Sequence, residues 1–374
     1  MNSNQKVVQS TALRLIEPGV FEKHLITHDI KNNDVVVKPY LGSICHADLR
    51  YYTGNRRKEA LNNKLPMALL HEALAVVEVS YHSNFKKGDR VVIVPSIPGY
   101  KLNNKKKEEC CANCKNNGYD NYCLNGKFLG SGYDGAAQSN LVISGENLVH
   151  IPEEVTDDIA ILAELCSVSL FAINLINDNN NKLITNSSPK VAVFGDGPLG
   201  YLTASALHFI YQIPKDNLQV FGAIPEKVNQ FEDFATTFLV NNYDFSGNTG
   251  FNTIFECTGG RFSSNAINQA IDLIDSQGNL VLMGVSEDLV SINTRDILEK
   301  NIRIIGSSRS TVIEFEQLMT GFTNPEYQKI LSKLIPNKHF EINNTMDLTE
   351  AMEVKAKDKG WEKAYLSFKW DNII

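Results

Sequence analysis

The pattern of apolar and polar positions changes near residue 159. Before that point, short runs rich in Val, Ile and Tyr alternate with turn residues, and amphipathic helices are scarce. The runs that best fit strands are 34–44, 73–82 and 88–96, with turns at Gly88–Asp89 and Pro98–Gly99. This first part of the chain is therefore predicted to be mainly β.

After residue 159, strand and helix patterns alternate. Residues 159–176 form an apolar run with helical spacing, too charged for a membrane span, and residues 190–194 resemble a strand buried on both faces. The predicted elements then continue as a helix at 199–210, a strand at 218–222, a helix at 227–236, a strand at 251–257, a helix at 266–274, a strand at 279–285, a helix at 296–300 and a strand at 302–307. Alternation over about 120 residues predicts a doubly wound parallel sheet. Short mixed elements return at 338–344, 349–357 and 364–370.

Length and composition indicate a globular chain of two domains. The 374 residues exceed one ordinary hydrophobic core, and the contents of 43% hydrophobic and 21% charged residues are typical of globular proteins. A net charge of −7 gives no reason to expect a nucleic-acid partner, and the basic run Lys105–Lys107 beside two glutamates fits a solvated loop. The polar N-terminal segment lacks a signal core and no stretch is long enough to span a bilayer, so we expect a cytoplasmic protein with no membrane partner.

A glycine-rich turn lies at the start of the alternating part. The sequence GDGPLG, Gly195–Gly200, follows a predicted strand and opens a predicted helix, which is the context that gives G-x-G-x-x-G its meaning. Gly195 permits the tight turn, Gly197 lets the backbone approach a pyrophosphate, and Gly200 lets the helix pack on the strand. The free amides at the helix N-terminus favour phosphate. We therefore predict a dinucleotide site, and not a plain strand–helix turn.

The second strand of this part bears on the choice of cofactor. An NAD site usually ends that strand with an acid that binds the ribose 2′-hydroxyl, whereas this strand ends at Gly222. A missing carboxylate removes repulsion against a 2′-phosphate, so the sequence favours NADP(H). Lys227 is a possible charge partner for the phosphate, although no arginine follows the strand.

Metal-ligand residue types stand ahead of the dinucleotide motif. Cys45 and His71 offer sulfur and nitrogen ligands, and Glu72 and Glu164 offer carboxylates. Each alone is more often structural, but their order before a dinucleotide fold favours a catalytic zinc that works with a nicotinamide.

The order GSIC…HE…AEL…GDGPLG resembles the medium-chain zinc-dependent dehydrogenase/reductase family over nearly the whole chain. Within that family, GSICHADLRYYTG, KLPMALLHE, SGYDG, FECTGG, MGVSE and NTRDILEK…GSSRS look like the ribulose 5-phosphate reductases that supply ribitol 5-phosphate for wall teichoic acid or capsule synthesis. The resemblance implies an α/β fold, with a doubly wound Rossmann domain at 161–310 and a mainly β GroES-like catalytic domain at 1–160 and 311–374. It also implies that Cys45, His71, Glu72 and Glu164 occupy the catalytic zinc positions, with Glu72 ranked below Cys45 and His71.

Many members of the family carry a second, structural zinc in a cysteine-rich lobe. Four of the seven cysteines lie between 110 and 123, a density that favours thiolate ligands in a reducing compartment over disulfides. Cys111, Cys114 and Cys123 fit the family spacing approximately, and the fourth ligand is Cys110 or Glu108. The alternative is a lobe that has lost its metal.

The implied reaction is reduction of a phosphorylated ketose by the nicotinamide hydride, with zinc polarising the carbonyl. Relatives often relay the proton through a Ser or Thr where this chain has Ala47, so His46, Asp48 or a zinc-bound water are the alternatives. The resemblance further implies that Lys363 contacts the cofactor pyrophosphate. It also implies a homodimer or homotetramer joined near 302–307 and coupling to a ribitol-5-phosphate cytidylyltransferase.

A phosphorylated substrate requires cations. Candidate phosphate ligands are Arg50, Arg56 and Arg57, which follow Cys45 closely, and Arg309 at the end of a predicted sheet strand. Two other functions stay open: an NAD-linked dehydrogenase of an unphosphorylated polyol such as ribitol, and a non-catalytic binding protein on the same fold.

Overall fold

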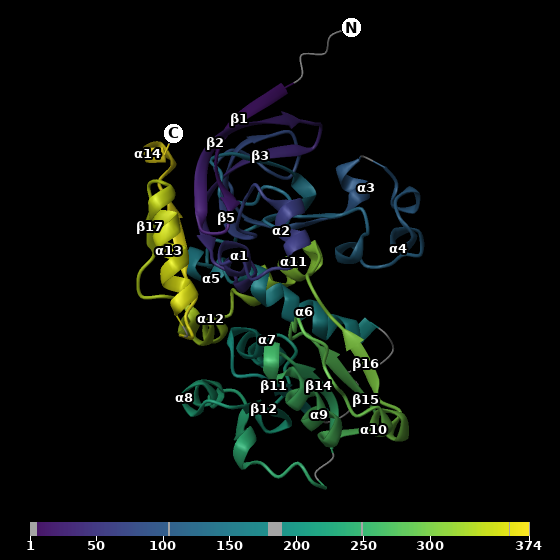
Figure 1. Ribbon diagram of the computed structural model, residues 1–374. Helices are drawn as coiled ribbons and strands as arrows, with labels where there is room; N and C mark the ends of the chain where they lie inside the picture. The colour runs from purple at the N-terminus through teal and green to yellow at the C-terminus, as the bar shows by residue number, and fades with distance from the viewer. Residues whose placement is uncertain (1–5, 104, 179–188, 248–249, 359, 374) are drawn as a thin grey trace. The chain divides into compact units, whose positions relative to one another are not determined.

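The computed structural model describes residues 6–103, 105–178, 189–247, 250–358 and 360–373, and it divides into two compact units (Figure 1). The first unit contains Met1–Glu164 and Thr311–Ile374, and the second contains Leu165–Ser310. The sequence placed the corresponding boundaries after residues 160 and 310. Helix α6 (Ala163–Asp178) begins in the first unit and continues in the second. No helix of the described residues is long and apolar enough to cross a bilayer.

The first unit is built mainly from antiparallel strands. Its largest sheet has the strand order β10-β6-β5-β3-β18-β17, with β9 also paired to β3; β2-β1-β4 and β7-β8 form two smaller sheets. The strands are β1 (Lys6–Glu17), β2 (Val20–Ile30), β3 (Asp34–Ser43), β4 (Met67–Ala68), β5 (Glu72–Ser80), β6 (Arg90–Ile93), β7 (Ser96–Ile97), β8 (Lys127–Phe128), β9 (Leu141–Ser144), β10 (Leu148–His150), β17 (Phe340–Ile342) and β18 (Tyr365–Phe368). Because β18 pairs with β3, the C-terminal segment completes the sheet begun by the N-terminal residues.

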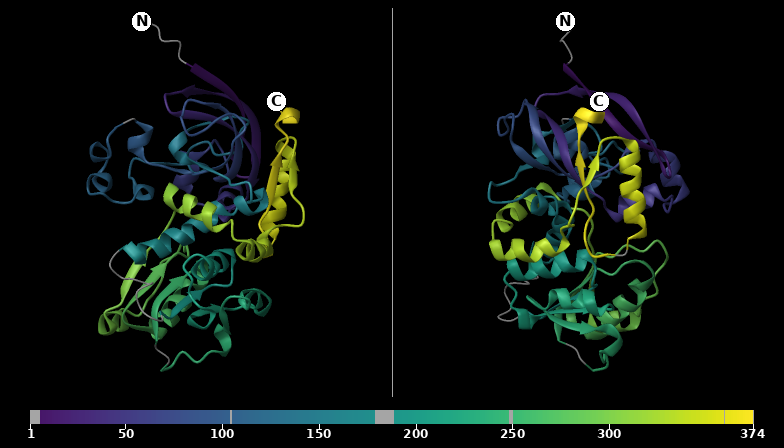
Figure 2. Two further views of the ribbon diagram at one scale, coloured as in Figure 1. Left: turned by 180° about the vertical axis from the view of Figure 1, so that it is seen from behind. Right: turned by 90° about the vertical axis from the view of Figure 1, so that its left-hand side faces the viewer.

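Short helices connect and cover these strands. They are α1 (His46–Tyr52), α2 (Lys58–Lys64), α3 (Gly99–Leu102), α4 (Ala112–Lys115), α5 (Asp157–Ala160), α11 (Val312–Gly321), α12 (Pro325–Leu331), α13 (Thr345–Lys357) and α14 (Trp370–Ile373), with the 3-10 helices η1 (Lys107–Glu109), η2 (Asp120–Tyr122), η3 (Gly145–Asn147) and η8 (Ser332–Leu334). Helix α13 shows why such a segment folds: the Asn344 side chain caps its N-terminus, and Leu348, Ala351 and Met352 form one apolar face. That face enters the core of the first unit, where α13 lies beside β17 (Figure 2).

The second unit is a parallel sheet with the strand order β13-β12-β11-β14-β15-β16. Its elements are β11 (Val191–Phe194), β12 (Leu218–Gly222), β13 (Thr236–Leu239), β14 (Phe251–Glu256), β15 (Ile274–Leu282), β16 (Arg303–Gly306), α7 (Pro198–Phe209), α8 (Pro225–Val228), α9 (Ser263–Leu273) and α10 (Thr294–Lys300), with η4 (Lys215–Asn217), η5 (Asn229–Phe231), η6 (Val240–Asn242) and η7 (Gly260–Phe262). The strand order reverses direction between β11 and β14. In sheets of this kind ligands bind at the carboxyl ends of the strands near such a reversal.

Burial in the sheet explains the sequence pattern of the second unit. All four residues of β11 are buried, as expected for a strand covered on both faces. Ala192 and Phe194 pack with Ala266 and Ile267 of α9, so alternate residues of the strand face this helix. The apolar run of the sequence therefore marks the centre of the sheet.

Two predicted elements differ from the structure. The helix predicted at 227–236 is wrong: α8 and η5 are single turns, and Thr236 already begins strand β13. Phe231 and Phe234 pack edge-on against Tyr201, and the β-branched pair Thr236 and Thr237 then joins the sheet. The long helix predicted at 159–176 is interrupted, with α5 ending at Ala160 and α6 beginning at Ala163.

Candidate functional site

The sheet of the first unit brings three predicted metal ligands together. Ligand atoms of Cys45, His71 and Glu72 all lie within 4.8 Å of one another. The register of β3 and β5 places Ser43 opposite Glu72. Cys45 lies just after β3 and His71 just before β5, so this one antiparallel pairing makes the two segments meet.

Asp48 ties the same two segments together. Its side chain is fully buried, Oδ2 accepts a hydrogen bond from the Cys45 amide at 3.0 Å, and Oδ1 accepts one from the Leu70 amide at 3.1 Å. Oδ1 also lies 3.8 Å from His71 Nδ1. A carboxylate behind a ligating histidine fixes the orientation of the ring. We therefore assign Asp48 a positioning role, although the sequence offered it as a proton relay.

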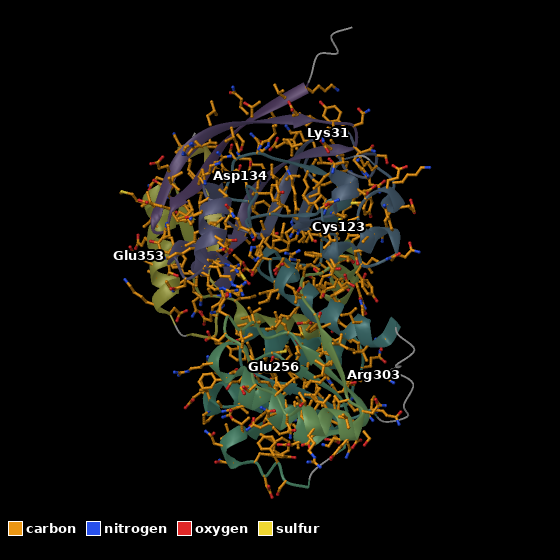
Figure 3. The ribbon with its side chains drawn as sticks, turned by 45° about the vertical axis from the view of Figure 1, so that its right-hand side comes forward. Lys31, Cys123, Asp134, Glu256, Arg303 and Glu353 are labelled. Carbon is orange, nitrogen blue, oxygen red and sulfur yellow. The ribbon has the colours of Figure 1, made fainter. Side chains whose placement is uncertain are left out.

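The backbone before His71 is held in an unusual conformation. Leu70 is fully buried with φ at +75°, a region that bulky residues rarely adopt. The amide of Ala136 donates to the Leu70 carbonyl at 2.8 Å, and Asp134 (Figure 3) accepts the Ala68 amide at 2.8 Å. A Cβ on Gly135 would lie 2.2 Å from the Leu70 oxygen, so only glycine fits there. The SGYDG segment thus supports the segment between β4 and β5 that carries His71.

Charge around the cluster fits a bound cation. Burial alone would lower the pKa of His71, but the negative groups of Asp48 and Cys45 raise it well above its usual value. Burial raises the pKa of Glu164 to about 7, with His71 acting in the opposite direction. Among the described residues His71 Nδ1 is buried without a hydrogen bond. A metal ion would compensate this concentration of buried acids and thiol, and the ligand types suit zinc.

Glu164 stands apart from the closest ligands. The three-residue cluster does not include it among the described residues, but it is buried and interacts electrostatically with His71. Its assignment as a zinc ligand stays a prediction.

Glu72 is engaged by a lysine from the far end of the chain. Nζ of Lys363 lies 2.9 Å from Oε1 and 2.8 Å from Oε2 of Glu72, and both side chains are buried. Burial alone would raise the pKa of Glu72, but Lys363 and His71 lower it. Nζ of Lys363 also donates to the Ile44 carbonyl at 3.2 Å. These contacts fit Glu72 as a charged neighbour of the metal, and the pyrophosphate contact of Lys363 stays a prediction.

The proton relay has one further residue to consider. His46 lies partly at the surface, next to Cys45. Desolvation, followed by the charges of Lys363 and Lys355, lowers its pKa. The lowered pKa favours the neutral imidazole, and the position of His46 lets it exchange a proton with solvent.

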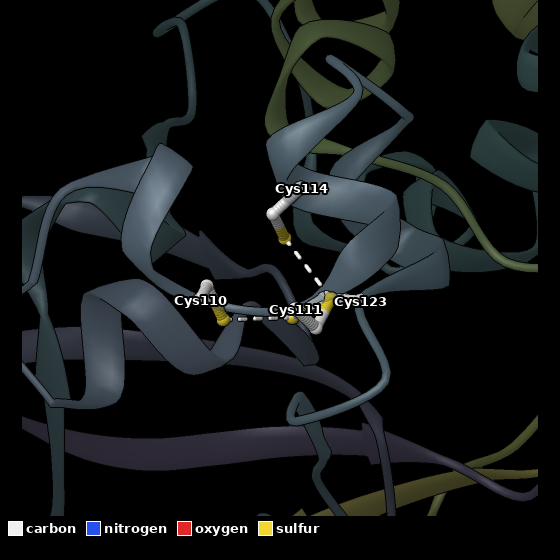
Figure 4. A group of neighbouring side chains, drawn as sticks. All are labelled: Cys110, Cys111, Cys114 and Cys123. Carbon is white, nitrogen blue, oxygen red and sulfur yellow. Dashed lines mark hydrogen bonds between the residues drawn. The ribbon is translucent and has the colours of Figure 1, made fainter.

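The cysteine lobe holds a second cluster (Figure 4). Sγ–Sγ distances are 3.6 Å for Cys110 and Cys123, 3.5 Å for Cys111 and Cys114, and 3.9 Å for Cys111 and Cys123. Four sulfur atoms around a tetrahedral zinc, with bonds of about 2.3 Å, lie about 3.8 Å apart. Among the described residues the cluster includes Cys110 and not Glu108. Of the two predicted alternatives for the fourth ligand, the geometry therefore favours Cys110.

Hydrogen bonds and burial shift the pKa values of three of these thiols, Cys110, Cys111 and Cys114, in different directions. The Cys114 amide, donating to Cys111, lowers the pKa of that thiol to about 6. Burial raises the pKa of Cys114 and of Cys110. The Gly99 amide donates to Cys123 Sγ at 3.2 Å. One thiolate forms readily, whereas four in one place require a cation, which is what a structural zinc supplies.

Replacing Cys114 with serine is expected to remove one zinc per chain and to lower the melting temperature, because the lobe would lose the metal ion that joins its cysteines. Metal analysis by plasma emission and differential scanning calorimetry measure the two effects. Activity of the folded protein should remain within about threefold of the parent, since this site fixes a loop. Unchanged zinc content in the variant would contradict a metal in the lobe.

The glycine-rich turn of the second unit has the geometry of a phosphate cradle. Gly195 has φ at +129°, and a Cβ on Gly200 would lie 2.0 Å from the Gly195 oxygen. Nothing lies within 4 Å of a Cβ built on Gly197, which caps the N-terminus of α7. The open space in front of free helix amides fits a pyrophosphate. Gly222 ends β12, and Lys227 lies half-buried in α8.

Three predicted phosphate ligands, Arg50, Arg56 and Arg57, lie in the same unit as Cys45, and Arg57 is the N-cap residue of α2. Arg50 is in the last turn of α1, and the guanidinium of Arg56 stacks over the Tyr51 ring at 4.8 Å. Within the described part of the chain, Arg56 Nε is buried without a hydrogen bond. Arg309 belongs to the second unit, where it follows β16 with φ at +60°.

Sequence reasoning missed several supporting residues. The Phe128 ring lies 5.3 Å from the His71 ring, and Asp134 and Gly135 contact the residues that precede His71. The SGYDG motif was the available signal for the last two, but only the fold gives its purpose.

The chain is similar to known dehydrogenases throughout. Residues 31–153 match the alcohol dehydrogenase GroES-like domain, and residues 225–324 match the zinc-binding dehydrogenase model. Ribulose-5-phosphate reductase 1 of Staphylococcus aureus is 37% identical over 96% of this chain and 98% of its own. A ribulose-5-phosphate reductase of Bacillus spizizenii is 32% identical over 95% of this chain and 98% of its own.

Solved structures agree with these matches. The crystal structure of Staphylococcus aureus TarJ in complex with NADPH has a TM-score of 0.79 and 33% identity, covering 96% of this chain and 99% of that one. The structure of Escherichia coli L-idonate 5-dehydrogenase has the same TM-score at 21% identity, which shows a shared fold.

Proposed function

Because the chain belongs to the family of zinc-binding dehydrogenases with a GroES-like domain, we propose that it reduces D-ribulose 5-phosphate to D-ribitol 5-phosphate with NADPH. The observation that carries this proposal is the Cys45–His71–Glu72 cluster in a chain that matches ribulose-5-phosphate reductases over almost its full length. Bound zinc supplies Lewis acidity for the ketose carbonyl, and bound NADPH supplies the hydride.

The residues of the chain supply the rest of the mechanism. Cys45 and His71 would hold the metal, with Glu164 as the third proposed ligand, and Asp48 would orient His71. Lys363 keeps the carboxylate of Glu72 charged beside them. Since Ala47 has no hydroxyl, we propose that His46 passes the proton between solvent and the substrate oxygen.

An absorbance assay tests the proposal. Loss of the NADPH band with ribulose 5-phosphate, prevented by prior treatment with a chelator and restored by zinc, is the expected result. Turnover of ribitol with NAD⁺ and none of ribulose 5-phosphate would favour the polyol dehydrogenase. Neither activity in a zinc-loaded protein would favour a binding protein.

Replacing Arg56 with alanine is expected to raise the KM for ribulose 5-phosphate about tenfold or more, because a guanidinium–phosphate pair is lost. The stacked guanidinium and its unbonded Nε support this role. Steady-state kinetics with unphosphorylated ribulose provide the control, since the turnover of a sugar without a phosphate should not change. An equal loss with both sugars would contradict a phosphate contact.

We also propose a context for the product. Ribitol 5-phosphate serves as a precursor of teichoic acid or capsule, and the consuming partner is a ribitol-5-phosphate cytidylyltransferase. A homodimer or homotetramer is supported by the edge strand β16 and by exposed Ile304, Leu298 and Leu289 near it in sequence; light scattering measures the number of chains. Seven free cysteines support a cytoplasmic location.

A further inference from the structure

A carboxylate from the glycine-rich turn reaches the end of the second strand. Oδ2 of Asp196, the residue between Gly195 and Gly197, accepts hydrogen bonds from the Ala223 amide at 2.7 Å and the Ile224 amide at 2.8 Å. These amides directly follow β12, which ends at Gly222.

Gly222 has a steric reason in this arrangement. A Cβ at this position would lie 2.6 Å from the Asp196 Cβ and 2.5 Å from Cγ2 of Val228. A larger residue than glycine at the end of β12 would therefore collide with the Asp196 side chain. The absence of an acid from the strand itself does not leave this end of the strand free of negative charge.

The position of this carboxylate matters for the cofactor. In dinucleotide-binding sheets the adenosine ribose lies at the end of the second strand, where an acid binds its 2′-hydroxyl and repels a 2′-phosphate. Asp196 occupies that end from a different loop and already uses two backbone amides. A 2′-phosphate would meet the carboxylate and would compete with it for both amides.

We propose that Asp196 is a specificity-determining residue that limits the preference of this enzyme for NADPH over NADH. With NADH, the carboxylate keeps its two amides and bonds the ribose hydroxyl. With NADPH, it releases the amides to the 2′-phosphate, and Lys227, three positions after Ile224, is the cation that would compensate the added charge. The inference rests on the proposed function for the identity of the hydride donor.

Replacing Asp196 with asparagine tests the charge without removing the side chain. Its amide oxygen can still accept from Ala223 and Ile224, so the loop keeps its support. We expect the ratio of NADH to NADPH dissociation constants to rise about tenfold, mainly through tighter NADPH binding. Nicotinamide fluorescence titrations of the zinc-loaded protein without substrate measure this ratio, and the ratio of kcat/KM values should follow it.

Asp196→Glu is the matched control, because it retains the charge and should keep the ratio within about twofold of the parent. An unchanged ratio in Asp196→Asn, or an equal loss of binding for both cofactors, would overturn the proposal and leave Asp196 a structural role. The titrations need no ribulose 5-phosphate. A shifted ratio in an enzyme inactive on that sugar would therefore refute the proposed function and support this inference.

Discussion

Replacing Cys45 with serine is expected to lower kcat/KM for ribulose 5-phosphate about a thousandfold and to remove one zinc per chain. The thiolate is a ligand of the proposed catalytic metal, whose loss withdraws several kcal/mol of stabilisation from the developing negative charge on the substrate oxygen. The other ligands cannot replace it, since Cys45 is the thiol of this cluster. Single-turnover absorbance measurements and metal analysis on the same preparation check both parts.

Cys166→Ser is the matched control for that experiment. Cys166 is a thiol too, fully buried where Cys45 is half-buried, and it belongs to α6 and to neither metal cluster in the described residues. This variant should keep both zinc content and activity close to those of the parent. Full activity in Cys45→Ser after loss of one zinc would refute the metal-assisted mechanism.

Replacing Lys363 with methionine is expected to lower the free energy of unfolding by about 3–5 kcal/mol at neutral pH. The change leaves the carboxylate of Glu72 buried without its main counter-ion, at a site where both partners are almost inaccessible to water. Burial alone raises the pKa of this group, and Lys363 brings it below its usual value. The ion pair therefore contributes stability above the unfolded pKa, and this contribution is lost as the pH falls through the lower folded pKa.

Without Lys363, Glu72 should take up a proton on folding, so the destabilisation should shrink toward acid pH. Urea unfolding at several pH values measures the change. Lys369→Met is the control, because its pair with Glu341, at 3.9 Å, is exposed and should contribute less than about 1 kcal/mol. Adding Glu72→Gln to Lys363→Met should restore part of the loss. Equal losses for the two lysine variants would contradict this account.

The parallel sheet could be predicted from the sequence because its central strands, β11, β12 and β14, are mostly buried. The run KVAVF lacks the alternation of polar and apolar residues that a half-exposed strand would show. The glycine turn after it marks where the strand ends and the helix begins. The segment 227–236 was misjudged because its apolar spacing fits a helix, while contacts of Phe231 and Phe234 with Tyr201 determine the actual path. The long strands β1 and β2 were not assigned, since half-exposed strands give a weak pattern.

The residue types of the candidate site could be predicted from the sequence, but the backbone pairing that brings them together could not. Cys45 and His71 were singled out by chemistry and resemblance, yet their approach depends on the pairing of β3 with β5 and on the positive φ of Leu70. Neither feature leaves a local signal. The inference from Gly222 shows the same limit, because the acid that lies there in space comes from Asp196, which a scan along the strand cannot find.

Strand β18 has a consequence for how the protein matures on the ribosome. The first unit cannot close its main sheet until β18, which pairs with β3, has been synthesised, although all the other strands of that sheet emerge first. The carboxylate of Glu72 has no lysine partner until Lys363, 291 positions later, has been synthesised. All residues of the second unit are synthesised before β18, so this unit can fold while the first unit is still incomplete. A nascent chain stalled before residue 363 should therefore be protease-resistant in the second unit only.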